Sequence, residues 1–573
     1  MDSYNFANMG EGKFNYDGTP RPGYIAKMFW AVVGSFLGFC FLLRICDTLL
    51  AYQRKQSLDA RPRMVWTKLH ATFTTIGRIF LYPSLPVFRR HSSFLYLPSV
   101  GRILFALTYM GLLLAFFFYK NPHSTSNEYE NAGYRAAWLS ITQLPLLVLL
   151  SSKRFTVITF LTGSSSSVSL NFFHRWVARG LLLTTTIHMY YMMKFYTSFQ
   201  YLVAQLRYDP ITRRGLGTWC VLAWIVVLTS VRPIRHYAFE LFFANHVISV
   251  IAFFVVLMKH TPSYSHVYSW IAIGFFIADV ALRWVFILLH NISSSGLKYR
   301  ATITADNDLV VIDVPFESSR MSSWKPGQYM NLSFPTLAPF TSHPFTITSL
   351  PKDGKMQFII RPKSGFTKRL QGLAAARSEE KQDDFLTRAV ILDGPYGGPS
   401  RAWNQFDAVS NIVSGVGATY AFASMRDILR DSRTCNSVSM LWIVQKYEDV
   451  LPFKEQLMNT FRDSVAGNSE TETSIQIFVA DENVSPLAAE LDSNLEMKIY
   501  SKKIEIISGK PDIRQSILQT LSKASGETAV AVCGSLSLAA QVKNDVAILL
   551  DARASHTGSG AQGCYVHVEQ FQG

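Results

Sequence analysis

The chain has 573 residues, of which 49% are hydrophobic and 17% are charged, and its formal net charge is +15. This length leaves room for about three structural units. The basic residues mostly follow long apolar runs in the first half of the chain, so the charge does not indicate a nucleic-acid-binding protein. The six cysteines show no Cys-x-x-Cys spacing, which argues against a disulfide framework and against a zinc site.

Apolar runs of spanning length predict a multi-pass α-helical membrane domain over residues 24–290. Residues 1–23 are polar and are expected to form an extracytosolic segment without a cleavable signal. Seven runs are candidates, and the fifth is the shortest: Tyr24–Leu50, Val100–Tyr119, Gly133–Leu150, Phe172–Tyr196, Gly217–Val231, Leu241–His260 and Tyr264–Leu289.

Basic residues follow the first, third and fifth runs, which lead into alternate loops of a multi-pass protein. Arg61, Lys153 and Arg232 are examples. Because positively charged loops stay in the cytosol, the N-terminus is predicted to lie outside it, and everything after about Asn291 is predicted to lie inside it.

Two histidine pairs stand inside these apolar runs. His174 and His188 are 14 residues apart, and His246 and His260 have the same spacing. Fourteen helical residues come within about 40° of four full turns and rise about 21 Å, so both histidines of a pair face the same way at two depths. If the two helices are neighbours, the four imidazoles form two bis-histidine sites. We expect an inner b-type haem at His174 and His246 and an outer one at His188 and His260.

The second half of the chain lacks the long apolar runs of the first half, and its pattern is typical of a soluble protein that contains strands. The segments ATITA, DLVVIDV and MQFIIRP alternate or are β-branched, which predicts strands. Further on, strands alternate with helices, which predicts a parallel sheet. Gly415-Val416-Gly417 lies between a predicted strand and a predicted helix, where bare backbone can approach a pyrophosphate.

Several motifs of this half resemble the ferredoxin-reductase-like flavoproteins, in the form found in ferric reductases and NADPH oxidases. They are His343-Pro344-Phe345-Thr346-Ile347-Thr348-Ser349, Gly365-Phe366-Thr367, Gly415-Val416-Gly417-Ala418-Thr419 and Cys533-Gly534. The resemblance implies that the first segment lies along the flavin and that Gly365 and Thr367 start a helix at the FAD pyrophosphate. It also implies that Gly415, Gly417, Thr419, Cys533 and Gly534 border NADPH, and that Phe571 covers the flavin.

The chain departs from the family pattern in the nicotinamide region. Ser535 stands where the family has proline, and Tyr420-Ala421-Phe422 replaces a Pro-Phe pair and is one residue longer. These departures bear on the nicotinamide site more than on the histidine pairs.

As a whole the chain resembles a fungal-type transmembrane ferric-chelate reductase, a metalloreductase of the ferric reductase and NADPH oxidase superfamily. The fold implied is the membrane domain followed by a cytosolic ferredoxin-reductase-like module. This module has an antiparallel β-barrel FAD domain at 297–400 and an α/β parallel-sheet NADPH domain at 408–573.

The resemblance implies that electrons pass from NADPH through FAD and two haems to extracytosolic Fe(III) chelates, with Cu(II) chelates as further acceptors. No side chain is then required as an acid, base or nucleophile. The expected partners are membrane lipid and metal chelates, and the expected location is the plasma membrane, with the endoplasmic reticulum as the alternative. Two other functions stay open: an NADPH oxidase that produces superoxide, and a haem-binding membrane protein without reductase activity. Sequence does not separate NADPH from NADH.

Overall fold

The computed structural model describes residues 21–569 except for 57–60, 91–92, 121–127, 155–156, 164–166, 232, 234–237, 295, 307, 317–322, 340, 381–385, 467–470, 481–502 and 555–562. The chain forms two compact units. The first contains Met1–Leu43 and Ile103–Trp284, and the second contains Arg44–Arg102 and Val285–Gln572. A segment from the apolar first half of the sequence therefore folds with the second half.

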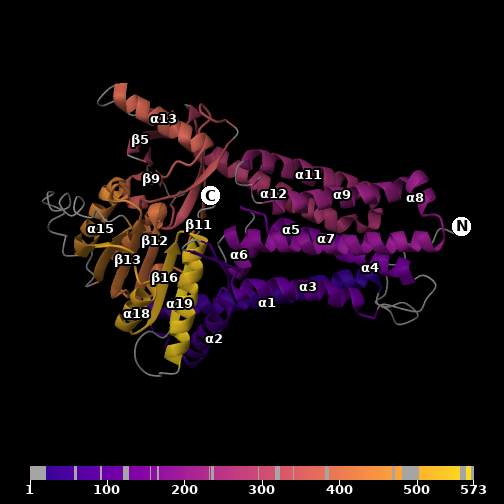
Figure 1. The fold of residues 1–573 in the computed structure, drawn as a ribbon, viewed down its shortest axis with the longest axis horizontal. Coiled ribbons are helices and arrows are strands. Elements are labelled where there is room, and N and C mark those ends of the chain that lie inside the picture. Colours follow the sequence, from indigo (N-terminus) through magenta and orange to yellow (C-terminus); the bar gives the residue numbers. More distant parts are fainter. Residues whose placement is uncertain are drawn as a thin grey trace. The chain divides into compact units, whose positions relative to one another are not determined.

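The first unit is helical. Within it α4 packs along α7 and α9 packs along α11 (Figure 1). Among the described residues, five helices are long and apolar enough to cross a membrane: Gly23–Lys55, Val100–Phe118, Pro210–Ser230, Phe239–His260 and Ser263–Asn291. The helices are α1 Pro22–Lys55, α3 Val100–Phe118, α4 Glu128–Thr142, α5 Leu144–Leu149, α6 Val157–Thr162, α7 Ser167–Ser198, α8 Leu202–Tyr208, α9 Pro210–Ser230, α11 Phe239–His260 and α12 His266–Asn291.

Two of the predicted spans differ from the helices observed. The run Gly133–Leu150 is not one helix, because it breaks at Gln143 between α4 and α5. Pro145 lies in the first turn of α5. Because proline has no backbone N–H, it cannot donate the hydrogen bond that would continue α4 into α5. In contrast, the run at Gly217–Val231 belongs to a 21-residue helix that begins at Pro210. Asp209 caps that helix by accepting hydrogen bonds from two backbone N–H groups of its first turn.

The part of the second unit that is expected to bind FAD, called the FAD-binding part, consists of two antiparallel sheets and one helix. The antiparallel strands agree with the antiparallel barrel that the resemblance implies. One sheet has the order β10-β5-β6-β9 and the other has the order β11-β7-β8. Their inward side chains, such as Ile312, Leu332 and Phe358, form a single core. The elements are β5 Arg300–Asp306, β6 Leu309–Pro315, β7 Gln328–Ser333, β8 His343–Thr346, β9 Lys355–Ile360, α13 Gly365–Glu380, β10 Leu386–Ala389 and β11 Ile391–Gly397.

The nucleotide-binding part has the predicted parallel sheet, with the strand order β15-β14-β13-β12-β16-β17. Two separate cores cover its faces, one beneath α14 and α15 and the other beneath α18 and α19. The elements are β12 Ala408–Ser414, α14 Ala418–Asp431, β13 Ser437–Val444, α15 Lys454–Ala466, β14 Glu472–Val479, β15 Ile504–Ser508, α18 Ile513–Lys523, β16 Glu527–Cys533, α19 Leu536–Ala554 and β17 Gly563–Glu569.

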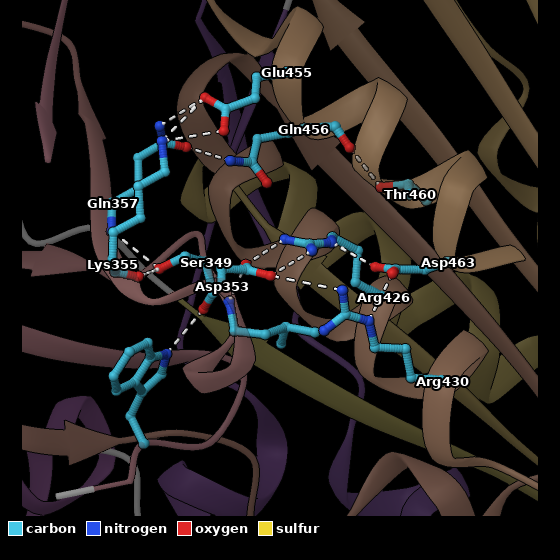
Figure 2. A network of polar contacts seen from close by, with 12 residues as sticks. Ser349, Asp353, Lys355, Gln357, Arg426, Arg430, Glu455, Gln456, Thr460 and Asp463 are labelled. Atoms are coloured by element: carbon cyan, nitrogen blue, oxygen red, sulfur yellow. Dashed lines mark hydrogen bonds and ion pairs between the residues drawn. The ribbon is translucent and has the colours of Figure 1, made fainter. Parts of the chain in front are cut away.

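A polar network fastens the FAD-binding sheets to the nucleotide-binding sheet (Figure 2). The buried Arg426 of α14 donates to Asp353 at 2.7 and 2.8 Å and to Asp463 of α15 at 2.7 Å. Lys355 of β9 pairs with Glu455 at 3.1 Å. Burial would raise the pKa of Asp353, but its hydrogen bonds with Arg426 outweigh burial and lower it. Both parts are thus held by charged pairs that are ionised near neutral pH.

A second buried ion cluster fastens helix α2 (Val65–Leu81) to the nucleotide-binding sheet. Glu527 begins β16 and is almost fully buried. Its two carboxylate oxygens accept one hydrogen bond each, from Arg54 at 2.8 Å and from Arg78 at 2.6 Å. Burial would raise the pKa of Glu527, but the two guanidinium groups outweigh burial and lower it to about 2. The segment that follows α1 is therefore anchored by a charge that persists over the physiological pH range.

We expect Glu527→Gln to destabilise this docking strongly, because both guanidinium groups would stay buried without a counter-charge. Breaking a buried pair of this kind typically costs about 3–5 kcal/mol. Thermal unfolding of the purified protein measures the loss. The control is Glu472→Gln, which removes an exposed pair with Lys523, where at most about 1 kcal/mol is expected. Equal effects of the two variants would contradict the anchoring role.

The ion cluster at Glu527 also predicts how the stability of the protein changes with pH. The folded pKa of Glu527 lies below the usual value of about 4.3 for a glutamate. The contribution of Glu527 to the free energy of unfolding is therefore complete above about pH 4.3 and is lost as the pH falls toward about 2. The difference in melting temperature between the wild type and Glu527→Gln should shrink over that window and stay constant from pH 5 to pH 8.

Candidate functional site

The four histidines of the first unit form two facing pairs, as their spacing predicts. The ring centres of His174 on α7 and His246 on α11 are 6.5 Å apart. Those of His188 and His260 on the same two helices are 6.2 Å apart. The two 14-residue spacings thus place one pair at each of two levels of the bundle.

Backbone carbonyls fix the orientation of three of the four rings. The Nδ1 atoms of His174, His188 and His260 lie 2.9, 2.8 and 2.9 Å from the carbonyl oxygens of Leu147, Gly133 and Ile211. A carbonyl only accepts, so each Nδ1 carries the hydrogen and donates it. The neutral tautomer that results leaves Nε2 with a lone pair, which is the atom that binds a metal. No sequence pattern points to these carbonyl partners, because each carbonyl comes from a segment distant from its histidine.

Glycine makes room for one of the rings. A Cβ atom on Gly215 of α9 would come within 2.5 Å of Cε1 and 3.0 Å of Nε2 of His260. Any larger residue at this position would displace the imidazole of His260. Gly215 is therefore a site residue that periodicity alone did not reveal, because a single glycine in a helix has many possible causes.

The region between the two histidine levels holds a buried polar cluster. Tyr109 donates to the side-chain oxygen of Gln143 at 2.7 Å, and Gln143 donates to Thr184 at 3.0 Å. Ser140 donates to the same Thr184 oxygen at 2.9 Å. These side chains satisfy one another inside an apolar bundle and join α3, α4 and α7 at a fixed register.

The donor set of each pair fits a haem better than a directly bound metal ion. Each pair offers two imidazoles and nothing else. Across the described residues, no group of three or more His, Cys, Asp or Glu side chains could hold a metal ion. A haem needs only two axial ligands from the protein, because the macrocycle supplies the others. The residues present are therefore suited to two bis-histidine haems.

The two segments expected at FAD lie next to each other in the second unit. His343 to Thr346 form β8, and Gly365 begins α13 in the left-handed region with φ of +57°. The rings of His343 and Phe366 stack with centres 4.8 Å apart and planes within 6°. The hydroxyl of Thr348 is buried and has no hydrogen-bond partner among the described residues, so a polar ligand could satisfy it. The expected helix start at Gly365 is observed, and the contact of both segments with FAD stays a prediction.

The glycine turns expected at NADPH also meet. A Cβ atom on Gly417 would lie 2.5 Å from the carbonyl oxygen of Cys533, and one on Gly534 would collide with the hydroxyl of Ser414. Both turns follow the carboxyl ends of β12 and β16, which are neighbours in the sheet. The strand order reverses between these two strands, and nucleotides bind at such a reversal. Thr419 closes the first turn by donating to the Val416 carbonyl at 2.9 Å.

The side chain of Cys533 packs in the core beside this turn. It is fully buried, and burial raises the pKa of the thiol well above its usual range. A neutral, buried thiol is a packing group rather than a reactive one.

The two departures from the family pattern are accommodated by packing. Ser535 stands before α19 and accepts a hydrogen bond from the N–H of Leu538 at 3.2 Å, which is the role of a helix cap. Tyr420 is fully buried, and its ring stacks on His567 of β17 with centres 5.6 Å apart. It also lies against Gly327, where a Cβ atom would come within 2.5 Å of the tyrosine ring. Phe571, the expected flavin cover, lies outside the described residues.

Three family models match the chain in the order of its parts. The ferric reductase like transmembrane component matches residues 136–257, the FAD-binding domain matches 295–400, and the ferric reductase NAD binding domain matches 406–547. The matches fall on the histidine bundle, the antiparallel sheets and the parallel sheet. Together they cover more than half of the chain.

Relatives with curated names point to the same family. The chain is 26% identical to "Probable cell surface ferric reductase kap2" of Aspergillus oryzae, over 68% of this chain and 54% of the relative. It is 22% identical to "Ferric/cupric reductase transmembrane component 2" of Schizosaccharomyces pombe, over 67% of this chain and 72% of the relative. It is 26% identical to "Ferric reductase transmembrane component 5" of Saccharomyces cerevisiae, over 70% of this chain and 56% of the relative. The chain thus spans about half the length of two of these three relatives.

The order of the three matched domains and the fungal reductase relatives agree with the geometry of the bundle and the two sheets. The chain therefore belongs to the ferric reductase family, with a transmembrane ferric-reductase-like domain followed by FAD-binding and NAD-binding domains.

Proposed function

We propose that this protein is a transmembrane, NADPH-dependent metalloreductase. Electrons would pass from cytosolic NADPH through FAD and two b-type haems to Fe(III) chelates outside the cytosol, and Cu(II) chelates would serve as further acceptors. A flavin is needed because NADPH gives two electrons together, whereas a haem takes one. The observation that carries this proposal is the pairing of four histidines at two levels between α7 and α11.

Each part of the chain has a defined task in this proposal. The imidazoles hold two irons at fixed depths, and carbonyl hydrogen bonds keep three Nε2 atoms aimed at them. The free N–H groups at the start of α13 face the FAD pyrophosphate, and the bare backbone of Gly417 and Gly534 lets the NADPH phosphates approach. Two axial histidines leave no open iron position, which suits electron transfer.

The plasma membrane is the location that we propose, because a chelate outside the cell must meet the outer haem. On the side that the charge pattern predicts to lie outside the cytosol, the connection from α7 to α9 and the connection from α11 to α12 are short, at residues 199–209 and 261–265. An acceptor would then reach the haem edge directly at the membrane surface. We therefore infer a broad tolerance for different chelates.

We expect alanine at any of the four histidines to abolish NADPH-driven reduction of an impermeant Fe(III) chelate, because an interrupted chain has no bypass. Haem absorbance should fall as well, while reduction of a soluble artificial acceptor by the flavin persists. His290→Ala is the control, since this half-buried histidine in the last turn of α12 lies outside both pairs. Two full haem equivalents in the double variant His188→Ala/His260→Ala would refute the haem assignment.

We expect Gly417→Ala to raise the KM for NADPH at least about tenfold, equivalent to about 1.4 kcal/mol. The new methyl group would meet a backbone carbonyl at 2.5 Å, so the two turns must move apart. FAD content should not change. The control is Gly372→Ala on α13, where a Cβ atom meets nothing within 4 Å. A normal KM in the Gly417 variant would argue against NADPH at these turns.

The identity of the electron acceptor is tested by measuring metal reduction with and without dioxygen. With membranes and NADPH, the initial rate of Fe(III)-chelate reduction should change less than about twofold when dioxygen is removed or superoxide dismutase is added. Direct electron transfer from the outer haem to the chelate needs neither dioxygen nor superoxide. Loss of metal reduction under both conditions would identify superoxide as the primary product, and the oxidase function would replace the one proposed.

A further inference from the structure

Helix α2 carries an apolar stripe that none of the described residues of its compact unit covers. Val65, Leu69, Phe73 and Phe80 are 75%, 65%, 62% and 67% exposed. Their spacing of three to four residues, continued by Ile76, places them on one side of the helix. Contiguous exposed side chains of this size mark an interaction surface rather than ordinary protein surface.

The opposite side of α2 is packed, so the stripe cannot turn inward. Thr67, Ala71 and Arg78 are buried, and Arg78 pairs with Glu527 at 2.6 Å. Ile79 packs against the core beneath α18 and α19, and the hydroxyl of Tyr82, just after the helix, accepts a hydrogen bond from the N–H of Val566 at 3.3 Å. These contacts fix the rotation of α2 about its own axis.

The position of α2 in the chain indicates that its apolar stripe contacts a lipid surface. α2 follows the candidate span Gly23–Lys55 and precedes the candidate span Val100–Phe118. A segment between two successive spans starts and ends at the same face of a membrane. Its apolar side chains therefore have a lipid surface within reach at both ends.

The charge of this segment selects the kind of lipid. Residues 44–102 contain ten Lys and Arg against two Asp and no Glu. Three of the basic residues close to the stripe, Arg61, Arg63 and Lys68, are exposed. Basic residues beside an apolar stripe favour an anionic leaflet, such as the cytosolic one.

We propose that α2 is an interfacial helix whose apolar stripe inserts among the lipids of an anionic membrane surface. Its packed side holds the nucleotide-binding sheet through Arg54, Arg78 and Glu527. The lipid surface and the sheet thus occupy opposite sides of one helix. This interaction surface does not depend on which acceptor the protein reduces.

The test uses the full-length protein with the photoreactive residue benzoylphenylalanine at Phe73 or at Phe80. The protein is reconstituted in bilayers of phosphatidylcholine and phosphatidylserine, irradiated and analysed by mass spectrometry. Val465 on α15 is the control position, because it is apolar and 69% exposed but lies outside the stripe. Retained flavin absorbance and NADPH oxidation show that each labelled protein is folded.

Lipid adducts at least tenfold more abundant at positions 73 and 80 than at position 465 would support the proposal. A fall of at least threefold when phosphatidylserine is replaced by phosphatidylcholine would support the anionic preference. Adducts with protein at 73 and 80, or lipid adducts no more abundant than at 465, would overturn the interfacial helix. Equal yields in the two lipid mixtures would overturn the assignment to an anionic surface.

Discussion

A polar group inside an apolar bundle is stabilised by pairing, and this constraint orients three of the four paired histidines of the first unit. Three imidazoles donate through Nδ1 to backbone carbonyls, which leaves their Nε2 atoms unprotonated and fixed in direction. The carbonyl of Ile211 lies in the first turn of α9, which begins at Pro210 and is capped by Asp209, and the second lone pair of this oxygen can accept from His260. The same helix passes close to His260 because residue 215 is a glycine. The geometry of the pairs thus depends on neighbours from three other segments.

In the second unit, buried charged side chains are compensated by ion pairs. Glu527 and Arg426 are both buried, and each is bound by two oppositely charged side chains, so the charges are compensated where they stand. Arg426 lies on α14, the helix that begins directly after the Gly417 turn. Its pairing with Asp353 therefore fixes that turn relative to the FAD-binding sheets. A hydride donor and a flavin must be held at contact distance, and this network supplies a rigid connection between their expected sites.

The features that the sequence predicted correctly are those with a local period or a local motif. The 14-residue spacing predicted the histidine pairs, and Gly415 to Gly417 predicted a turn between a strand and a helix. What failed was the continuity of the apolar run at Gly133–Leu150, where Pro145 overrides hydropathy. Long-range pairs were missed altogether, because Arg78 and Glu527 are far apart in sequence and neither stands in a motif. Pairing across such distances depends on the tertiary fold and leaves no local signal.

The departures near the nicotinamide turn bear on whether the reductase function is retained. A decayed site would leave a cavity or a broken turn where the family pattern changes. Instead, Ser535 caps α19, and Tyr420 fills the space between Gly327 and His567 without displacing the contact between Gly417 and Cys533. Each substitution thus has a packing partner of its own. The tyrosine also spans the boundary between the FAD-binding and nucleotide-binding parts, so it adds to the connection that Arg426 makes. These observations favour a working nucleotide site over a haem protein that has lost its reductase activity.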